Sequence, residues 1–364
     1  MQLSSTLAWL VDAAVAAPAA DRFLAELGAR LIADGTPLAG GALTLAAPHP
    51  LIARRTWLWR SDSGAVIEAL GFAAAGLPGL GPAEPPGDAG RGWLERLAAG
   101  SVHEDVVGPG LDAPSLGWIA PHSFTAAETD RLSEAARFAA APLAALVARA
   151  TLTAILEAYL GRRSAARVLA GPLRRGGGET IRAALLCADL RGFTALSEAA
   201  PPAAVIGALD AWFDRIAGAV HAFGGEVLKF LGDGMLAIFP VGEGAPGAAC
   251  EAALRAVAAA RAGMAHLDAA RRLEGLPPLP FGAAVHLGEI LWGNVGAADR
   301  LDFTAIGPAV NLVSRLEGLC RPLDRTVLVS GAVAAQTRTA LIPLGTHALR
   351  GIAAPCAVFT VAEN

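Results

Sequence analysis

Two short apolar runs joined by an Asp-Gly turn place the tightest constraint on how this chain folds. Residues 226–231 read EVLKFL and residues 235–240 read MLAIFP, with Asp233 between two glycines in the gap. An Asp-Gly dipeptide between apolar runs is a strong short-range signal for a β-hairpin. The sequence therefore predicts two antiparallel strands here, with Asp233 in the turn.

The regions around this hairpin extend it into a larger pattern. Residues 181–190 (IRAALLCADL) form a short, almost continuously apolar run, which is typical of a buried strand. Helical patterns cover 203–223 and 248–269, and 281–291 (FGAAVHLGEIL) again indicates a strand. The order is β-α-β-β-α-β, the ferredoxin-like arrangement of an α+β fold, which hosts many functions.

The first 150 residues predict a smaller α+β domain. A helical region over 4–33, broken near Pro18, precedes strand patterns at 56–62 and 65–72. A loop rich in Gly, Pro and acidic residues is expected over 77–91.

A long helix is predicted to close this domain. It begins near Ser123 or Thr125, either of which is a suitable N-cap, and Glu128 lies in its first turn. The segment FTAAETDRL (124–132) resembles the end of GAF-like sensory domains, which implies a regulatory role for residues 1–150.

Residues 151–180 are expected to connect this domain to the region 181–364. TLTAILEAYLGRRSAARVL reads as helix, and GPLRRGGGET then interrupts the pattern with three consecutive glycines, 176–178. A helix followed by a glycine hinge suits a joint between a regulatory and an effector domain.

Composition narrows the function classes. The 364 residues carry 29 Lys+Arg against 33 Asp+Glu, a net charge of −4, whereas nucleic-acid binding usually shows a basic stripe. The four cysteines are scattered without a CxxC pair, which argues against zinc and fits a reducing compartment. Pro142 and Arg149 interrupt the Ala-rich run 138–156. We therefore expect a cytoplasmic protein without membrane insertion or nucleic-acid binding.

Two aspartates are the leading candidates for chemistry. Asp189 ends the strand predicted over 181–190, and adjacent strands would bring Asp233 to the same sheet edge. Hard carboxylate oxygens are the ligands that Mg²⁺ prefers, and two such ions can assist an in-line displacement. Backbone N–H groups at the helix start near Phe193 and Thr194 are suited to phosphate binding. Taken singly, each aspartate is better explained by a helix cap or an ordinary hairpin turn; taken together, they favour a metal site.

Three motifs in order carry a family resemblance. They are CADLRGFTALSE, GGEVLKFLGDGMLAIFP, and LGEILWGNVGA followed by DFTAIGPAVNLVSRLEGLC. They resemble the class III nucleotidyl cyclase catalytic domain over about residues 180–362. The resemblance implies two Mg²⁺ or Mn²⁺ ions held by Asp189 and Asp233, with the Leu190 carbonyl as a main-chain ligand.

The same resemblance implies roles for the remaining motif residues. Lys229 and Thr304 match the positions that read the base, where Lys favours adenine and many members carry Asp in place of the threonine. Asn311 and Arg315 match the transition-state pair and, four residues apart, share a helix face. Arg350 falls where the family often has a phosphate-contacting lysine.

The implied activity is an adenylate cyclase that converts ATP into 3′,5′-cyclic AMP and pyrophosphate. Because the family builds each site from two protomers, a homodimer with composite sites is implied, with an unidentified small molecule or protein regulating residues 1–150. Two alternatives stay open: a cyclase for guanine or pyrimidine nucleotides, and a non-catalytic signalling module on the same fold.

Overall fold

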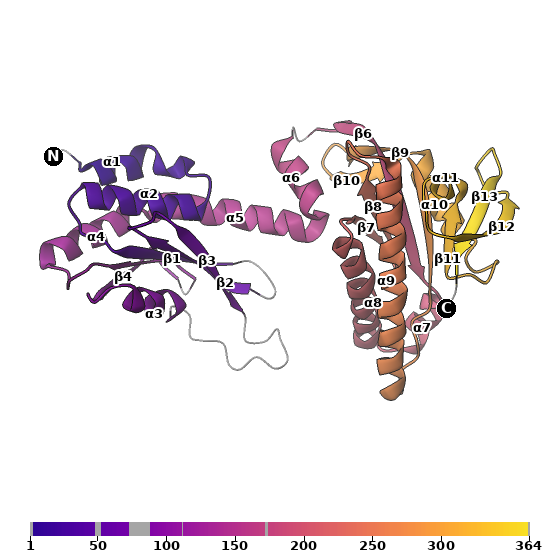
Figure 1. Ribbon diagram of the computed structural model, residues 1–364, viewed down its shortest axis with the longest axis horizontal. Helices are drawn as coiled ribbons and strands as arrows, with labels where there is room; N and C mark the ends of the chain where they lie inside the picture. The colour runs from indigo at the N-terminus through magenta and orange to yellow at the C-terminus, as the bar shows by residue number, and fades with distance from the viewer. Residues whose placement is uncertain (1–2, 48–51, 73–87, 111, 172–173, 363–364) are drawn as a thin grey trace. The chain divides into compact units, whose positions relative to one another are not determined.

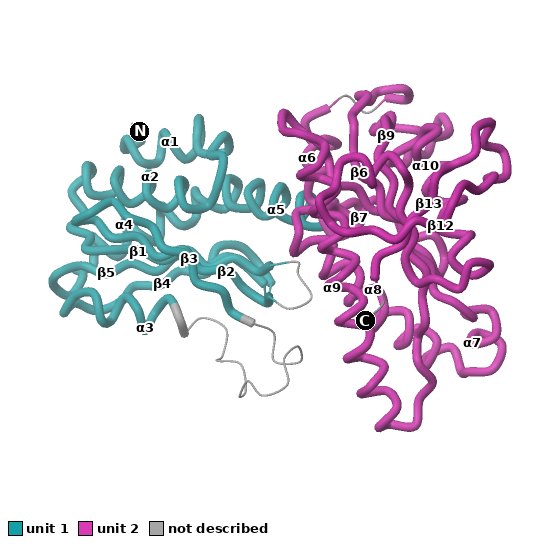
Figure 2. Tube along the Cα trace, turned by 45° about the vertical axis from the view of Figure 1, so that its right-hand side comes forward, with its two compact units in different colours: residues 1–155 teal, residues 156–364 magenta. Residues whose placement is uncertain are grey.

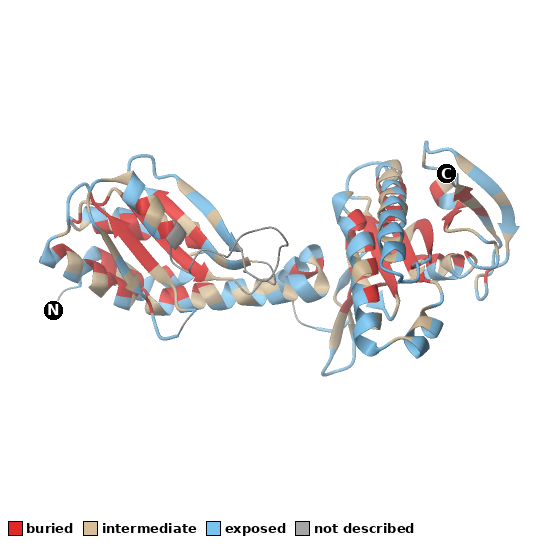
Figure 3. Ribbon diagram, turned by 90° about the horizontal axis from the view of Figure 1, so that it is seen from below, coloured by how far each residue is buried: buried red, intermediate tan, exposed pale blue. Residues whose placement is uncertain are grey.

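The computed structural model describes residues 3–47, 52–72, 88–110, 112–171 and 174–362. The chain divides into two compact units, Met1–Ile155 and Leu156–Asn364, which Figure 2 colours separately. Buried residues, red in Figure 3, gather on the strands of each unit. Each unit is therefore described by itself.

Unit 1 is built on a five-stranded antiparallel sheet in the order β3-β2-β1-β5-β4. One face is covered by a core that includes Phe23, Leu43 and Leu132, and the other by a smaller cluster around Leu94 (Figure 1). The strands are β1 (Gly40–Ala46), β2 (Ile52–Arg60), β3 (Val66–Phe72), β4 (Val102–Val106) and β5 (Ser115–Ile119). The helices are α1 (Ser5–Asp12), the short 3₁₀ helix η1 (Ala14–Ala16), α2 (Ala20–Ala33), α3 (Asp88–Leu97), α4 (Ala126–Phe138) and α5 (Ala140–Leu160).

Local sequence signals explain several of these elements. The predicted break near Pro18 is confirmed, because it lies between η1 and α2. Thr125 is the N-cap of α4: its hydroxyl accepts from the Glu128 N–H at 3.3 Å, and the Glu128 carboxylate accepts from the Thr125 N–H at 2.8 Å. This reciprocal capping box satisfies two helix-end donors.

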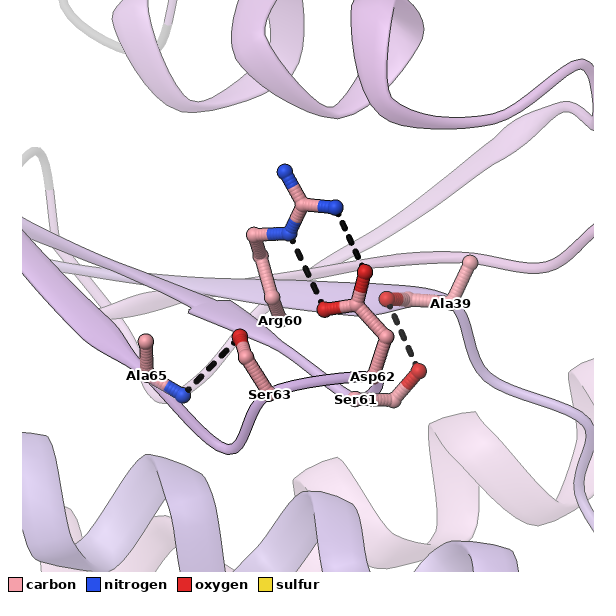
Figure 4. A network of polar contacts seen from close by, with 6 residues as sticks. All are labelled: Ala39, Arg60, Ser61, Asp62, Ser63 and Ala65. Atoms are coloured by element: carbon pink, nitrogen blue, oxygen red, sulfur yellow. Dashed lines mark hydrogen bonds and ion pairs between the residues drawn. The ribbon is translucent and has the colours of Figure 1, made fainter.

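The turn between β2 and β3 is fixed by polar contacts that Figure 4 shows. Asp62 pairs with Arg60 at 2.5 Å, and the Ser61 hydroxyl donates to the Ala39 carbonyl at 3.0 Å. The Ala65 N–H donates to the Ser63 hydroxyl at 3.4 Å. These contacts tie the turn to the segment that enters β1, which helps set the register of both strands.

Other parts of unit 1 differ from the sequence predictions. The loop predicted over 77–91 falls largely outside the described residues, and α3 begins within it at Asp88. His103 and Asp105 lie in β4, where the ring nitrogen Nε2 is 2.7 Å from the Asp105 carboxylate, and the Ser133 hydroxyl also donates to that carboxylate at 3.0 Å. These contacts tie β4 to α4, and the described residues contain no group of three or more metal-ligating side chains.

Unit 2 contains an eight-stranded sheet with the order β12-β13-β11-β9-β6-β8-β7, and β10 also pairs with β9. Its strands are β6 (Gly178–Leu190), β7 (Glu226–Leu231), β8 (Gly234–Pro240), β9 (Phe281–Gly296), β10 (Leu301–Ile306), β11 (Val327–Ser330), β12 (Leu341–His347) and β13 (Cys356–Val361). Its helices are α6 (Arg162–Ala170), α7 (Phe193–Ala199), α8 (Pro202–Ala222), α9 (Pro246–Leu273), α10 (Pro308–Glu317) and α11 (Gly331–Ala334).

The ferredoxin-like prediction is confirmed. Strands β6, β7, β8 and β9 occur in that chain order and lie in the spatial order β9-β6-β8-β7, with α8 and α9 in the crossovers (Figure 1). Helices α8 and α9 pack with one face of the sheet through Trp212, Ile216 and Val257. Helix α10 packs on the other face through Val313 and Leu316. Strands β10 and β12 extend the sheet beyond the predicted core.

The three consecutive glycines differ from the expected hinge. The Gly176 N–H donates to the Asn294 carbonyl at 3.1 Å, and the Asn294 N–H donates to the Gly177 carbonyl at 2.7 Å. A Cβ on Gly178 would lie 2.9 Å from the Trp292 carbonyl oxygen. Glycine is therefore needed here for close approach to β9, and this stretch is bound to the sheet.

Helix α5 bears on the prediction of no membrane insertion. It is the one helix among the described residues that is long and apolar enough, by length and composition alone, to cross a membrane. Only 11% of the most apolar stretch of α5 is buried. The buried residues of the helix are Pro142, Leu143 and Leu146, near its start. The absence of membrane insertion stays a prediction.

Helix α6 is held to the sheet of unit 2 by one buried carboxylate. Glu226, the first residue of β7, is 4% exposed and accepts hydrogen bonds from the Ser164 N–H at 2.9 Å and the Ser164 hydroxyl at 2.7 Å. It also accepts from the Arg163 N–H at 3.2 Å. A carboxylate at a helix N-terminus satisfies orphan N–H donors and interacts favourably with the helix dipole.

We expect Glu226→Ala to destabilise unit 2 by about 2–3 kcal/mol, because it leaves three donors at the start of α6 without their acceptor. Ser164→Ala removes one donor with its hydrogen bond and should cost about 1 kcal/mol. Urea denaturation of both variants and the wild type measures the difference. Equal stability of Glu226→Ala and the wild type would contradict this role.

Candidate active site

The two predicted aspartates meet at one end of adjacent strands. Asp189 in β6 lies opposite Gly234, the residue after Asp233, and the Leu190 N–H donates to the Asp233 carbonyl at 3.2 Å. A Cβ on Gly234 would lie only 2.8 Å from Oδ1 of Asp189. Glycine after Asp233 therefore leaves the space that the Asp189 carboxylate occupies.

Electrostatics at this pair fit a cation site. Partial burial raises the pKa of Asp189 above its usual value, and the charge of Asp233 raises it further. Two ionised carboxylates held this way repel each other, and a divalent cation between them would relieve that repulsion. The donor set, carboxylate oxygens with the backbone of Leu190 next to them, suits Mg²⁺ or Mn²⁺.

A third acidic residue lies near this pair, and the sequence analysis missed it. Glu317 is the last residue of α10, and a Cβ on Gly282 would lie 2.5 Å from its Oε1. Burial raises the pKa of Glu317 to about 7, with the charges of Asp189 and Asp233 adding to the effect and Arg191 opposing it. Its position at the end of an amphipathic helix gave no signal that it would reach the sheet edge.

The segment after Asp189 turns sharply into a short helix. Gly192 adopts a left-handed conformation with φ of 76°, and α7 begins at Phe193. Phe193 packs partly against the core, whereas Thr194 is exposed. Helix α7 therefore begins four residues beyond Asp189, directly after the end of β6.

Lys229 is directed by an irregularity in its strand. The register of β7 against β8 shifts between Val227 and Lys229, so Leu228 forms a bulge. Bulges commonly re-aim a side chain next to a functional site. The Lys229 ammonium group forms an ion pair with the carboxylate of Asp302 in β10.

Asp302 is a second residue that the sequence analysis missed. It lies two positions before Thr304 in β10, so both side chains leave the strand on the same face. The intervening Phe303 is buried on the other face. Lys229, Asp302 and Thr304 therefore form one polar group, and the signal that could have identified Asp302 is the period-2 alternation of LDFTAI.

Asn311 and Arg315 are presented together by α10. Both are exposed and lie one turn apart, while Val313 and Leu316 anchor the opposite face in the core. Gly307, whose φ is 138°, is the N-cap residue of this helix, and Pro308 is its first residue. Arg350 is exposed in the turn between β12 and β13, and no contact joins it to the other predicted residues in the described part of the chain.

Within one chain, the predicted residues thus form three separate groups. Asp189 and Asp233 make the first, Lys229 and Thr304 with Asp302 the second, and the α10 pair the third. Lys229 precedes Asp233 by four residues, about 13 Å along an extended strand. A single chain therefore carries all three groups, and no hydrogen bond or ion pair among the described residues joins them.

Comparison with known proteins identifies the class. Residues 179–349 match the family model described as the Adenylate and Guanylate cyclase catalytic domain. Adenylate cyclase 1 of Rhizobium meliloti is 35% identical over 167 residues, which are 45% of this chain and 25% of that protein. Adenylate cyclase of Anabaena cylindrica is 31% identical over 162 residues, 43% of this chain and 31% of that protein.

A solved structure supports the same fold. A bacterial light-regulated adenylyl cyclase superposes with a TM-score of 0.53 at 21% identity, covering 71% of this chain and 85% of that chain. The family model over residues 179–349 shows that unit 2 contains a nucleotidyl cyclase catalytic domain. The matched segment spans only a quarter to a third of the curated relatives' length. The GAF-like character of unit 1 stays a prediction.

We expect the stability of the wild type to fall as pH rises from about 4.5 to 7. Folding raises the pKa of Glu317 to about 7, so the folded state binds more protons than the unfolded state in this window. Glu317→Gln stays uncharged and should remove ~1–2 kcal/mol of this decline, after allowance for solvent screening. Denaturant titrations at pH 5 and pH 7.5 measure the free energy of unfolding of both proteins. An equal change in that free energy between the two pH values for the wild type and Glu317→Gln would contradict the prediction.

Proposed function

We propose that unit 2 is an adenylate cyclase that converts ATP into 3′,5′-cyclic AMP and pyrophosphate. The observation that carries the proposal is the placement of Asp189, at the end of β6, beside Asp233 in the turn that leads into β8. Two carboxylates so placed suit a triphosphate with its divalent cations. The chain also carries a base-contacting group around Lys229 and an exposed Asn311–Arg315 pair.

Asp189, Asp233 and the carbonyl of Leu190 would hold two Mg²⁺ or Mn²⁺ ions. When bound, such ions neutralise phosphate charge and lower the pKa of an attacking hydroxyl. The repulsion that raises the pKa of Asp189 supports this assignment, because a divalent cation stabilises both carboxylates in their charged form.

The proposed reaction is attack of the ribose 3′-oxygen on the α-phosphorus. A new P–O bond closes the ring, the bond to the β-phosphate breaks, and pyrophosphate leaves with that electron pair. Asn311 would orient the ribose, and Arg315 would donate to the α-phosphate oxygens as their charge increases. N–H groups at Phe193 and Thr194 would bind the β- and γ-phosphates, with Arg350 as a further contact. Most of the rate increase would come from positioning and charge stabilisation.

Selection of adenine follows from donor and acceptor chemistry. Lys229 would donate to the N1 acceptor of adenine, whereas N1 of guanine carries a hydrogen and would face another donor. The ion pair with Asp302 supports this role because it restrains a flexible side chain near Thr304. The Thr304 hydroxyl would accept from the adenine amino group, although a hydroxyl also donates and therefore discriminates less than a carboxylate.

A two-fold homodimer would complete the site. Asp189 and Asp233 of one protomer would face Lys229, Thr304, Asn311 and Arg315 of the other, giving two sites per dimer. Large apolar side chains near these groups support an interface, because they are exposed in the single chain. They are Ile206, Phe230, Leu231, Leu291 and Ile306.

Unit 1 would regulate this cytoplasmic enzyme. The connection through α5 and α6 supports the proposal, because α6 is bonded to β7, the strand that carries Lys229. Deletion of residues 1–150 should change the rate of cyclic AMP formation or its response to cell extracts. Unchanged rates with and without these residues would argue against regulation.

We expect Asp189→Ala and Arg315→Ala each to lose at least a hundredfold in cyclase activity, because one removes a cation ligand and the other the transition-state cation. An equal mixture of the two should recover about one quarter of wild-type activity, because half of the dimers are mixed and each contains one intact site. Anion-exchange separation of cyclic AMP measures it. A mixture as inactive as its components would contradict the composite site, and Arg272→Ala is a matched control on an exposed arginine.

We expect Lys229→Ala and Asp302→Asn to reduce the preference for ATP over GTP about tenfold or more, since each loosens the donor that faces N1 of adenine. Competition between equal concentrations of ATP and GTP, with both cyclic products quantified, measures the ratio. Asp299→Asn, three residues before Asp302 in the loop between β9 and β10, is the control. A wild-type preference for GTP would favour the guanylate cyclase alternative.

A further inference from the structure

A cavity of about 870 Å³ lies within unit 2, away from the groups assigned to the cyclase site. It is formed between α6, the first residues of β6 and the loop that follows β8. Residues 179–182 of β6 line it, whereas Asp189 is at the other end of the same strand, roughly 23 Å along the chain. Trp292 lines it from the sheet face that also buries Phe303, opposite the face of Asp302 and Thr304.

Positive charge is concentrated around this cavity. Arg163 and Arg167 line it from α6, and Arg182 lines it from β6. Glu179 is the single acidic side chain in the lining, and it is already paired with Arg167. Among the described residues, no carboxylate forms an ion pair with the side chain of Arg163 or Arg182. The lining therefore has an excess positive charge of about two, which an anion would neutralise.

The arginines are attached to fixed elements. Arg163 and Arg167 are four residues apart on α6, so they project from one side of the helix. The first turn of α6 is hydrogen-bonded to the buried carboxylate of Glu226. The backbone N–H of Arg163 is one of the donors. The Arg167 guanidinium lies 4.4 Å from the centre of the Trp292 ring. The planar guanidinium groups of Arg163 and Arg182 match the oxygen geometry of a phosphate.

The lining also contains the ring of Trp292 and several apolar side chains. Trp292 is 3% exposed, and its indole N–H, which is itself buried, has no hydrogen-bond partner among the described residues. Buried polar groups in native proteins normally have a partner. Ile181, Pro240, Val241 and Pro246 supply apolar surface in the same cavity. A ligand with both an anionic group and an apolar body would match the arginines and this apolar surface.

We propose that this cavity binds a small organic phosphate, such as a nucleoside monophosphate. The phosphate contacts Arg163 and Arg182, and the apolar body lies against Ile181, which packs with the same face of the sheet as Trp292. The volume is in the range typical of small-molecule sites. A tetrahedral phosphate offers three oxygens to guanidinium groups from two different elements, where a carboxylate offers two. The proposal does not depend on the cyclase activity.

Isothermal titration calorimetry of the full-length protein with adenosine 5′-monophosphate tests the proposal. Inorganic phosphate and adenosine are titrated in parallel, since one lacks the apolar body and the other lacks the charge. We expect the monophosphate to bind at least tenfold more tightly than either. The double variant Arg163→Ala/Arg182→Ala should weaken this binding at least tenfold, whereas the exposed-arginine control Arg272→Ala should not change it.

A further variant separates this cavity from the proposed cyclase site. Arg315→Ala removes the proposed phosphate contact of that site and should leave the calorimetric affinity unchanged. Loss of binding in Arg315→Ala with retention in the double variant would overturn the proposal, as would no detectable binding at millimolar ligand. Both substituted arginines are exposed, so the double variant should fold, and its thermal denaturation is compared with that of the wild type.

Discussion

Unit 2 depends on the pairing of β6 with its two neighbours. This strand pairs with β9 from Gly178 to Leu190 and with β8 from Ala183 to Asp189, so it is the central strand of the ferredoxin-like core. Its interior residues are almost all buried because both faces are covered. The same register that buries these side chains brings Asp189 beside the turn of the neighbouring hairpin. Two like charges are thus held together by a sheet that cannot shift without moving its apolar residues out of the core.

The close placement of Asp189 and Asp233 is typical of a functional site. Burial and repulsion from Asp233 disfavour the charged form of Asp189. The charged carboxylate therefore destabilises the folded chain. Perturbed carboxylates cluster at functional sites because binding a cation or substrate offsets that cost. Glu317, at the end of α10, is a third carboxyl group whose charge interacts with this pair. Arg191 partly compensates, and its guanidinium also donates to the Arg325 carbonyl.

Much of this architecture could be predicted from the sequence. The hairpin around Asp233 and the apolar run ending at Asp189 have strong local signals, and together they fix the core order. Asp302 and Glu317 were not predicted, because their importance arises from contacts between residues 73 and 128 positions apart in the chain, Lys229 with Asp302 and Asp189 with Glu317. The glycines at 176–178 were misinterpreted for the same reason. Their composition suggests flexibility, whereas their contact with Trp292 and Asn294 makes them part of the sheet.

Strand β7 joins two features that the sequence separates. Its first residue, Glu226, binds the start of α6, and its fourth, Lys229, reaches Asp302. Three residues of one strand span about 10 Å, and the bulge at Leu228 lies between the two contacts. Movement of α6 would therefore act on a short strand at a point where its pairing is already irregular. A displacement there changes the position of Lys229 more readily than that of Asp189, whose strand is paired on both sides. The proposed base-contacting residue Lys229, rather than the proposed cation ligands, therefore lies on the strand that is bonded to α6.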